Sequence, residues 1–496
     1  MPLFNPEGSK RPPWLLRVRS STAFIIATVW ISSFTDFFLY AMIVPVMPSA
    51  LVDRAGVPYS DREYWVSVLL MCESAVALVC CPLFGWLIDI APTRQFSYLL
   101  GLVLLGASMG LLSAAHTVSL FIAARLLQGG ATAMVTVAGL ALLTDSVAFD
   151  NLGQSIGYLG SAIALGFLLG PLLGGLVYDA AGYQAVFAMS FAIIGVDLIM
   201  RVAVIEKKVA RLWIHESPET TSAEHEHDDH ETQSHASSNP DLVKSPKLAL
   251  LLIARQPRVI ISSWALLVQG ILYSAFDSVW ALFPRHLEQQ STDTRQTIPI
   301  FVESRFHWGP FGAGLTFLPS AFTAFFEPYF GRLSDRYGAR LVTFTGFLLL
   351  TPPLVCLRFV EYNTKEHIAL LMSLLTMIGL LVNLCIPALF VEAQQALEDI
   401  ERVRPGLFGK NGAVAQAFGI QTMAQFTGMT LGPLWGGFIE SRFGWKTMSW
   451  TLGLLAGLTA FPMLWLSGRP LRIQLQEDGD EEEREHLIPN HDNRDD

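Results

Sequence analysis

Long apolar stretches separated by short polar segments make up most of the chain. Twelve of them approach or exceed the roughly 20 mostly apolar residues that a helix needs to cross a bilayer. In chain order they cover residues 21–48, 65–88, 96–115, 118–143, 153–178, 183–204, 259–283, 310–333, 341–359, 367–389, 413–439 and 447–466. The pattern therefore predicts an all-α membrane protein with twelve transmembrane helices.

A polar stretch divides these helices into two sets of six. The predicted organisation is an N-terminal tail (1–20), a six-helix bundle (21–204), a linker (205–258), a second six-helix bundle (259–466) and a C-terminal tail (467–496). With both tails and the linker on one side, 23 of the 33 lysine and arginine residues lie on that side. Because positive residues favour the cytosol, we expect both termini and the linker to be cytosolic. The first apolar run is too long for a cleaved signal peptide and is expected to stay as an anchor.

Composition agrees with a membrane protein and excludes other classes. Hydrophobic residues make up 52% of the chain and charged residues only 15%, against about 25% charged in a typical soluble domain. A soluble enzyme and a disordered or fibrous chain are therefore not expected. The five cysteines lie in or beside apolar stretches, which indicates no disulfide or zinc framework. No metal site or cofactor is predicted, and no nucleic-acid partner.

A ten-residue pattern, G-x-x-x-G-P-x-x-G-G, occurs once in each half. Its residues are Gly166, Gly170, Pro171, Gly174 and Gly175 in the fifth span, and Gly428, Gly432, Pro433, Gly436 and Gly437 in the eleventh. Small residues four apart let helices approach closely, and proline bends a helix. The repeat predicts two similarly oriented halves, with a substrate site near the midplane between them. Tight static packing is the alternative interpretation of each motif.

A second repeated pattern, P-x-x-G-x-x-x-D, ends the second and eighth spans on the predicted cytosolic side. It contains Gly85 and Asp89 in the first half, and Gly331, Asp335, Arg336 and Arg340 in the second half and the loop that follows. A carboxylate at this position can meet a facing helix N-terminus or a basic side chain. We expect these residues to form a cytoplasmic gate, with ordinary helix capping as the alternative.

These motifs resemble those of the major facilitator superfamily. The stretch from Gly331 to Arg340 is similar to the loop signature of the family, and the glycine–proline pattern is similar to that of its proton-coupled drug antiporters. Arg125 begins an R-x-x-Q-G motif of the same family. The resemblance covers about residues 21–466 and implies two six-helix bundles that rock about a central site.

The first span is similar to that of vesicular amine transporters. Asp36 lies in it and is followed by a V-P-x-x-P run. The resemblance implies that Asp36 binds an amine or a proton. In the tenth span this chain has Asn383 where those transporters carry a carboxylate.

Ionisable residues inside predicted spans each require a reason, because a mid-span charge costs about 2.5–3.5 kcal/mol or more. The candidate substrate and proton residues are Asp36, Glu73, Arg125, Asp277, Glu327 and Asn383. For Asp36 the alternative is a hydrogen bond between helices; for Arg125 it is a fixed counter-ion to a neighbouring carboxylate. Glu73 and Asp277 lie near the non-cytosolic ends of their spans, where we expect them to face water. Glu327 is expected to line the cavity of the second half.

Other residues receive simpler interpretations. Asp197 and Arg201 are four residues apart and predict a local ion pair. Aromatic side chains could line the cavity or face lipid. They are Tyr40, Trp264, Tyr273 and Trp280.

Two polar segments carry further patterns. Five of the 11 histidines lie between His215 and His235, and a disordered connector is favoured over a metal site there. The acidic C-terminal tail contains Glu483, Leu487 and Ile488, which fit an acidic dileucine sorting signal. This pattern favours a vesicular or vacuolar membrane over the plasma membrane, with a sorting adaptor as a partner.

The sequence therefore favours a monomeric secondary transporter that exchanges protons for an organic cation or amphipathic drug-like solute. It lacks a phosphate-binding G-x-x-x-x-G-K-[ST] loop that would indicate ATP as the driver. An exporter of a neutral or acidic natural product is the first alternative. A metal transporter and an enzyme are less favoured, because no histidine lies well inside a predicted span. A non-transporting receptor is less favoured, because it would not need mid-span ionisable groups such as Asp36 and Arg125.

Overall fold

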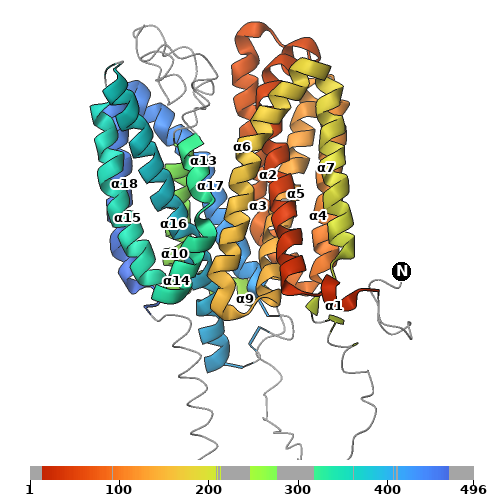
Figure 1. Ribbon diagram of the computed structural model, residues 1–496, viewed down its shortest axis with the longest axis vertical. Coiled ribbons are helices and arrows are strands. Elements are labelled where there is room, and N and C mark those ends of the chain that lie inside the picture. Colours follow the sequence, from red (N-terminus) through yellow and green to blue (C-terminus); the bar gives the residue numbers. More distant parts are fainter. Residues whose placement is uncertain are drawn as a thin grey trace, which may run out of the picture.

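The chain folds into two helical bundles that stand side by side (Figure 1). The computed structural model describes residues 14–91, 93–207, 209–210, 213, 246–275, 318–360, 362, 364–405, 407–408 and 412–468. These ranges contain helices and no strands. The all-α prediction is therefore confirmed.

The first bundle contains four helices of 29–32 residues, α2, α3, α5 and α6, and two shorter ones, α4 and α7. Its elements are α1 (Leu16–Arg19), α2 (Thr22–Asp53), η2 (Tyr59–Asp61), α3 (Arg62–Ile90), α4 (Arg94–Ser113), α5 (Val118–Ser146), η3 (Phe149–Asn151), α6 (Leu152–Ala181) and α7 (Tyr183–Ala203). Most boundaries agree with the predicted spans to within a few residues.

The second bundle begins after residue 245. Its described elements are α9 (Pro246–Ala254), α10 (Pro257–Ser274), α13 (Leu318–Ala324), α14 (Glu327–Tyr337), α15 (Ala339–Cys356), η6 (Leu357–Phe359), α16 (Lys365–Val403), α17 (Val414–Phe443), α18 (Trp445–Ala460) and η7 (Phe461–Trp465). Across the described ranges of both bundles, nine helices are long and apolar enough to cross a membrane. The count of twelve spans stays a prediction.

The eighth predicted span is broken. Its described part is not one helix over 310–333 but two helices, α13 and α14, with the break at Phe325 and Phe326. Pro328 lacks an N–H and cannot donate to a carbonyl one turn earlier. The N–H groups of Phe325 and Phe326 instead donate to carbonyls three residues back, at 3.3 and 3.1 Å.

Helix α16 is much longer than predicted. The sequence placed the tenth span at 367–389, but the helix contains 39 residues and continues to Val403. At 1.5 Å per residue it is about 58 Å long, against about 30 Å for the bilayer core. Hydropathy marked only the apolar part, whereas the extension is stabilised by packing of Ala393, Ala396 and Leu397 against α9 and α17.

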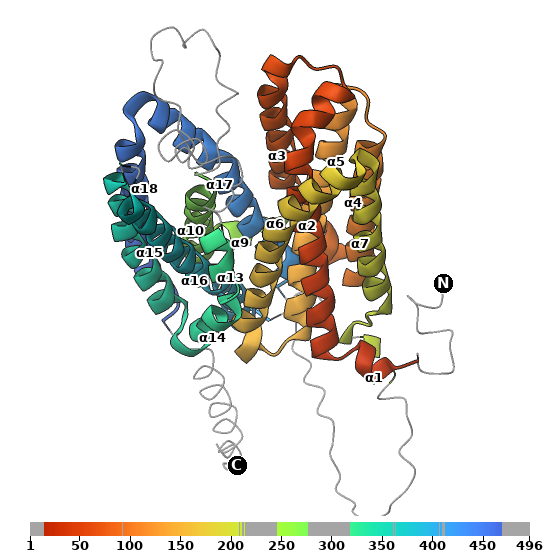
Figure 2. The same cartoon turned by 45° about the horizontal axis from the view of Figure 1, so that its top comes forward.

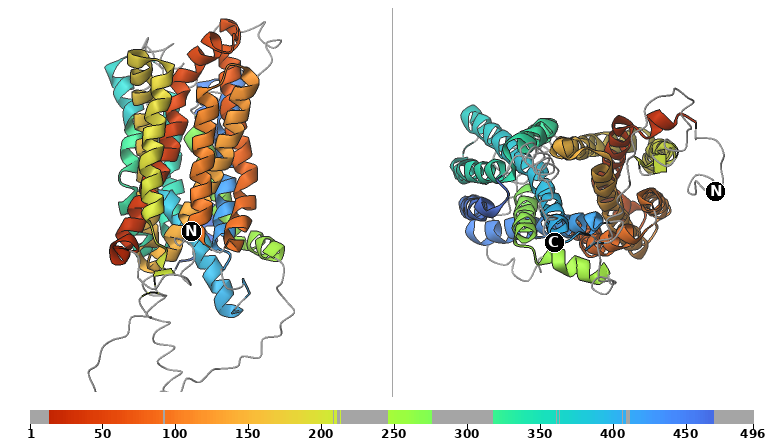
Figure 3. Two further views of the ribbon diagram at one scale, coloured as in Figure 1. Left: turned by 90° about the vertical axis from the view of Figure 1, so that its right-hand side faces the viewer. Right: turned by 90° about the horizontal axis from the view of Figure 1, so that it is seen from below.

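Helix α9 lies within 205–258, the range expected to be an unordered connector. That expectation is wrong for residues 246–254. Ala249 and Ile253 of α9 are buried against Ala417 and Ile420 of α17. Seen from below, α9 runs along one edge of the molecule (Figure 3).

The repeated glycine–proline motif packs in the same way in both halves. Gly166, Gly170 and Gly174 of α6 face the backbone of α2 so closely that an added Cβ would contact it within 3.0 Å. Gly428, Gly432 and Gly436 of α17 face α10 likewise. Gly175 has open space beside it. Each motif therefore joins two helices of the same half. Both α6 and α17 continue through their prolines, Pro171 and Pro433.

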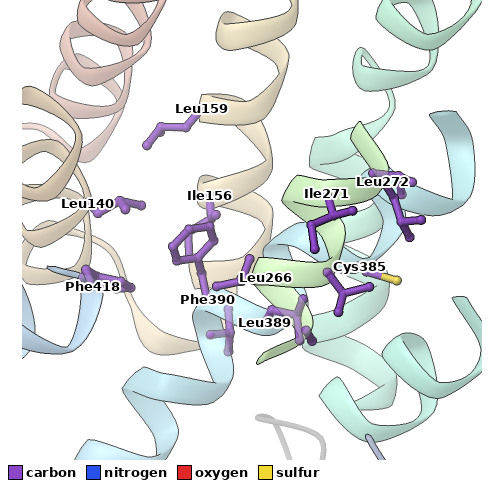
Figure 4. Close-up of a cluster of buried hydrophobic side chains, with 14 of the residues drawn as sticks. Leu140, Ile156, Leu159, Leu266, Ile271, Leu272, Cys385, Leu389, Phe390 and Phe418 are labelled. Atoms are coloured by element: carbon purple, nitrogen blue, oxygen red, sulfur yellow. The ribbon is translucent and has the colours of Figure 1, made fainter. Parts of the chain in front are cut away.

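An apolar cluster joins the two halves. It contains Leu140 of α5 and Ile156 of α6 from the first half, and Leu266 of α10, Phe390 of α16 and Phe418 of α17 from the second. Figure 4 shows these side chains gathered between the bundles. Helices α3 and α17 pack together, as do α6 and α14. These contacts lie toward the lower end of Figure 1, where α14 and α9 lie, and we call it the latch end.

Candidate functional site

Asp36 lies on α2 and faces α5 inside the first bundle. Its side chain is buried, with 1% of the residue exposed. Thr132 Oγ1 of α5 donates a hydrogen bond of 2.9 Å to Asp36 Oδ1. The other oxygen, Oδ2, has no partner among the described residues. The helix-to-helix hydrogen bond that was the alternative interpretation is present, but it uses only half of the carboxylate.

Arg125 and Glu73 form a buried ion pair between α5 and α3. Arg125 Nη1 lies 2.6 Å from Glu73 Oε2 and also donates to Gln128 Oε1 at 3.0 Å. Glu73 is only 3% exposed, so the expectation that it faces water is wrong. Hydropathy placed it near a span end, but Gly129 lets α5 approach the Glu73 backbone closely and exclude solvent. Arg125 is thus the counter-ion of Glu73.

Two nitrogens of Arg125 remain unused. Nε and Nη2 are buried and have no hydrogen-bond partner among the described residues. The guanidinium carbon lies 5.8 Å from the centre of the Tyr40 ring on α2. The Asp36–Arg125 region therefore contains both an unpaired acceptor and unpaired donors.

A second buried ion pair lies in the same bundle. Asp197 and Arg201, both on α7, pair at 2.9 Å, which confirms the predicted local pair. Ser32 of α2 donates to Asp197 at 2.6 Å, and Arg201 donates to the carbonyl of Tyr98 on α4. Both charged residues are fully buried. This pair ties α2, α4 and α7 together.

Aromatic rings lie between the two halves, close to Arg125. The ring of Phe167 on α6 is 5.8 Å from that of Tyr40 and 6.3 Å from that of Tyr273 on α10. Trp264, by contrast, is 45% exposed on the outer surface of its helix. Of the aromatic candidates in the described ranges, Tyr40 and Tyr273 therefore approach the centre and Trp264 does not.

In the second half, Asn383 and Glu327 occupy different surroundings. Asn383 of α16 is buried and its Nδ2 donates to Thr323 Oγ1 of α13 at 3.2 Å. Glu327 begins α14 and faces Gly157 and Gly160 of α6. It therefore lies at the contact between the halves, rather than with the charge cluster around Asp36.

The two repeated aspartates cross-link the halves at the latch end. Asp89 at the end of α3 accepts hydrogen bonds from the N–H groups of Ala415 and Gln416, at 3.1 and 3.0 Å, in the first turn of α17. Asp335 of α14 accepts from the N–H groups of Gly153 and Gln154, both at 2.9 Å, in the first turn of α6. Each carboxylate thus satisfies orphan N–H groups at the positive end of a helix in the other half. We call these contacts the α3–α17 latch and the α14–α6 latch.

Glycines make these latches possible. An added Cβ on Gly85 would overlap with the carbonyl of Ala415, and one on Gly331 would overlap with the carbonyl of Gly153. The helices can therefore approach until backbone touches backbone. In Figure 2, α14 and α6 lie side by side at this end.

Two residues of the predicted gate do not join the latches. Arg340 Nε donates to the Leu466 carbonyl at 2.8 Å, which ties α15 to the end of the last helix of the same half. Arg336 lies over the ring of its neighbour Tyr337. Their closeness to Asp335 in the sequence suggested that both arginines take part in the gate. The contacts described here instead lie within the second half.

Sequence reasoning missed several buried polar residues. Arg94 bridges Asp89, at 2.6 Å, and Asp145 of α5, at 3.2 Å. Glu392 of α16 is fully buried and accepts from Arg258 at 2.5 Å and from the Ser467 N–H at 2.9 Å. A signal was present, since a basic side chain was one expected partner of Asp89 and Arg94 lies five residues after it, but the sequence analysis did not pair the two.

Several predicted residues lie outside the described residues. They are Asp277, Trp280, the histidines from His215 to His235, and the tail residues Glu483, Leu487 and Ile488. Gly437 lies within α17, but its surroundings are not described. Within the described ranges, no group of three or more His, Cys, Asp or Glu residues could hold a metal ion.

Comparison with known proteins agrees with this architecture. The chain matches the family described as Major Facilitator Superfamily over residues 29–295 and 294–490. It is 29% identical to the MFS-type transporter ppzB of Metarhizium rileyi, over 90% of this chain and 95% of that protein. It is 26% identical to the probable vesicular acetylcholine transporter-B of Danio rerio, over 37% of this chain and 38% of that protein.

A solved structure has the same fold. The human organic anion transporter MFSD10 (TETRAN) superposes with a TM-score of 0.63 and 16% sequence identity, covering 91% of this chain and 100% of that one. The family match, the match to ppzB and the structural match extend over most of the chain. The chain therefore belongs to the major facilitator superfamily of membrane transporters, and within it is similar to the vesicular amine transporters.

Proposed function

We propose that this transporter exchanges protons for an organic cation or a cationic amphipathic solute, which it exports or stores in a vesicle or vacuole. The observation that carries the proposal is the half-satisfied carboxylate of Asp36. One of its oxygens is bonded to Thr132, and the other is buried without a described partner. A buried carboxylate in this condition can accept a proton or pair with a cation, but cannot do both at once.

The charge count in the first bundle supports an exchange at Asp36. Apart from the buried Asp89, Arg94 and Glu206, three buried carboxylates, Asp36, Glu73 and Asp197, accompany two buried guanidinium groups, Arg125 and Arg201. Two carboxylates are paired with these arginines, and Asp36 is not. With all five groups ionised, one negative charge remains, and one proton or one monovalent cation would neutralise it.

The neighbouring groups suit a cationic solute. Tyr40 and Phe167 offer ring faces, which attract cations, close to the same cluster. Arg125 retains unpaired donors that can bind a hydroxyl or carbonyl oxygen of the solute. The partial similarity to a vesicular acetylcholine transporter, whose name indicates an organic cation, supports this class.

In this proposal the two latches close the cytosolic side while Asp36 exchanges its ligand on the other side. The bundles then rock, the latches separate, and Asp36 faces the cytosol. A proton binding on the outer or luminal side displaces the cation, and a cytosolic cation displaces the proton. The acidic dileucine pattern in the tail supports a vesicular or vacuolar membrane as the place where this occurs.

The proposal is tested in proteoliposomes with an imposed pH gradient. Uptake of labelled cationic, neutral and anionic solutes is compared for wild type, Asp36→Asn and Thr132→Val. We expect gradient-driven uptake of a cation that is abolished in Asp36→Asn. Thr132→Val keeps the carboxylate and is expected to retain uptake, weaker by at most about tenfold to a hundredfold, since one hydrogen bond to a charged group is worth about 1.5–3 kcal/mol at most. Uptake of a neutral or anionic solute that is unaffected by Asp36→Asn would contradict the cation site.

A further inference from the structure

The α14–α6 latch extends upward into a row of close contacts. Positions 327, 331 and 335 lie one turn apart on α14 and face α6. Gly331 meets Gly153, Asp335 bonds to the N–H groups of Gly153 and Gln154, and Glu327 lies against Gly157 and Gly160. Added Cβ atoms on Gly157 and Gly160 would overlap with the Glu327 backbone and carboxyl group respectively. The carboxyl group of Glu327 is therefore enclosed when the two halves are in contact.

Glu327 differs from the two latch aspartates in its bonding. Asp335 accepts two backbone hydrogen bonds, and Asp89 accepts two and also pairs with Arg94. Glu327 is 3% exposed, and its Oε2 has no hydrogen-bond partner among the described residues. No ion pair to Glu327 is present within the described ranges either.

The arginines described near Glu327 contact other groups: Arg332 donates to Gln154 Oε1, Arg336 lies over the Tyr337 ring and Arg340 donates to the Leu466 carbonyl. Helix α6 has no charged residue between Leu152 and Pro171, and its one titratable group there, Tyr158, is 37% exposed. Helix α13 has none. The remaining charged or titratable groups nearby are Asp150 of η3, Asp335, Arg332, Arg336, Tyr329 and Tyr337 of α14 itself, Arg340 of α15, which bonds to the Leu466 carbonyl, and Cys385 and Glu392 of α16, the latter bonded to Arg258.

We propose that Glu327 is a second proton-binding site, and that the cytosolic side of the transporter closes only when Glu327 carries a proton. An ionised carboxylate enclosed without a partner costs several kcal/mol, whereas a neutral carboxyl group fits the same contact at far lower cost. Separation of α14 from α6 is therefore coupled to loss of the proton. The proton leaves toward the cytosol as the contact opens, and the carboxylate is solvated there.

This inference rests on the proposed proton-coupled function and deepens it. Asp36 exchanges proton and solute in the first half, while Glu327 binds a proton at the contact between the halves and sets which side is open. The repeated motif creates the two latches symmetrically, but only the α14–α6 latch has a buried glutamate two turns from its aspartate. Closure of the two latches together is thus controlled from one of them.

The test measures opening directly, without any solute. Spin labels are attached at Asn151→Cys of η3 and Tyr337→Cys of α14, both exposed and on opposite halves. The three partly exposed native cysteines, Cys72, Cys80 and Cys356, are replaced by alanine. Pulsed electron spin resonance then gives the distance distribution in lipid nanodiscs from about pH 5 to about pH 9, a range that includes buried carboxyl groups.

We expect the ratio of open to closed molecules of the otherwise wild-type chain to rise with pH by up to about tenfold per unit, the slope of one proton. Glu327→Gln mimics the protonated group and is expected to stay closed, with the acid-state distance, at every pH. Asp36→Asn is expected to keep the pH response. Asp335→Asn is expected to shift the ratio toward open at every pH and to keep the slope.

Three results would overturn the inference: a flat wild-type ratio, a Glu327→Gln variant with the wild-type slope, or a slope lost in Asp335→Asn and kept in Glu327→Gln. These outcomes are independent of the solute experiment. Loss of gradient-driven cation uptake with an intact slope would remove the proposed antiport and keep the Glu327 site. The reverse result would remove the Glu327 site and keep the antiport.

Discussion

The carboxylate of Asp89, in the first half, lies 3.0 Å from the backbone nitrogen of Gln416, in the second half. The same carboxylate is 2.6 Å from Arg94 of its own half. Arg94 also reaches Asp145, so the charge of Asp89 is partly balanced before it meets α17. Asp89 therefore caps the N-terminus of a helix in the other half and attaches the two halves to each other.

Removing this cap should favour the open arrangement. Asp89→Ala deletes two hydrogen bonds to a charged acceptor, each worth about 1.5–3 kcal/mol at most, so we expect the open-to-closed ratio to rise by roughly tenfold or more. Reactivity of a cysteine introduced at Gln416, which is buried in the closed arrangement, measures the change. Asp145→Ala is the matched control, because it removes a partner of Arg94 and leaves both Asp89 hydrogen bonds to α17 in place; equal reactivity of the two variants would contradict the cap.

The packing of α6 on α2 predicts a strong difference between two glycines of the same motif. A Cβ on Gly170 would lie 2.8 Å from the Ala41 Cβ and 2.8 Å from the Phe38 carbonyl oxygen, whereas Gly175 has nothing within 4 Å. We expect Gly170→Ala to destabilise the protein by about 1–3 kcal/mol. Gly175→Ala should be neutral or slightly stabilising. Thermal unfolding in detergent compares the two variants, and similar melting temperatures would show that the motif is not a packing motif here.

The Arg125–Glu73 pair predicts non-additive effects. Arg125→Gln leaves a buried glutamate without its counter-ion, which costs about 3–5 kcal/mol. The double variant Arg125→Gln with Glu73→Gln removes both charges, and we expect it to regain at least half of the lost stability. A double-mutant cycle on thermal stability measures the coupling. Simple addition of the two single effects would mean that the pair is not coupled.

Glu392 should matter more than another glutamate of the same helix. It bonds to Arg258 at the start of α10 and to the Ser467 N–H after the last helix, so it links three segments of the second half. We expect Glu392→Ala to cost about 3 kcal/mol or more, because it leaves Arg258 with fewer partners. Glu398 accepts from Gln394 on its own helix. Glu398→Ala is therefore the control and should cost under about 1 kcal/mol, as judged by unfolding temperature.

Local patterns in the sequence were enough for the secondary structure of most spans. Apolar length gave the positions of helices such as α2 and α7, because a backbone in a bilayer must satisfy its hydrogen bonds within each helix. The repeated glycines predicted close helix contacts for the same local reason. The spacing of Asp197 and Arg201 predicted their pair, since residues four apart share a helix face. Pro328 alone did not show whether its helix would bend or break.

Contacts between residues far apart in the chain were decided by the tertiary structure. The sequence placed Asp89 and Asp335 at helix ends, but the crossing of each to a helix of the other half depends on how the bundles dock. It placed Glu73 near water, whereas Gly129 brings α5 over it and buries it with Arg125. It ended the tenth span at 389, whereas packing against α9 and α17 continues α16 to Val403. Hydropathy is a property of each segment and indicates whether that segment prefers lipid or water. The partner of a buried charge depends on how several helices pack together, and one segment alone does not contain that information.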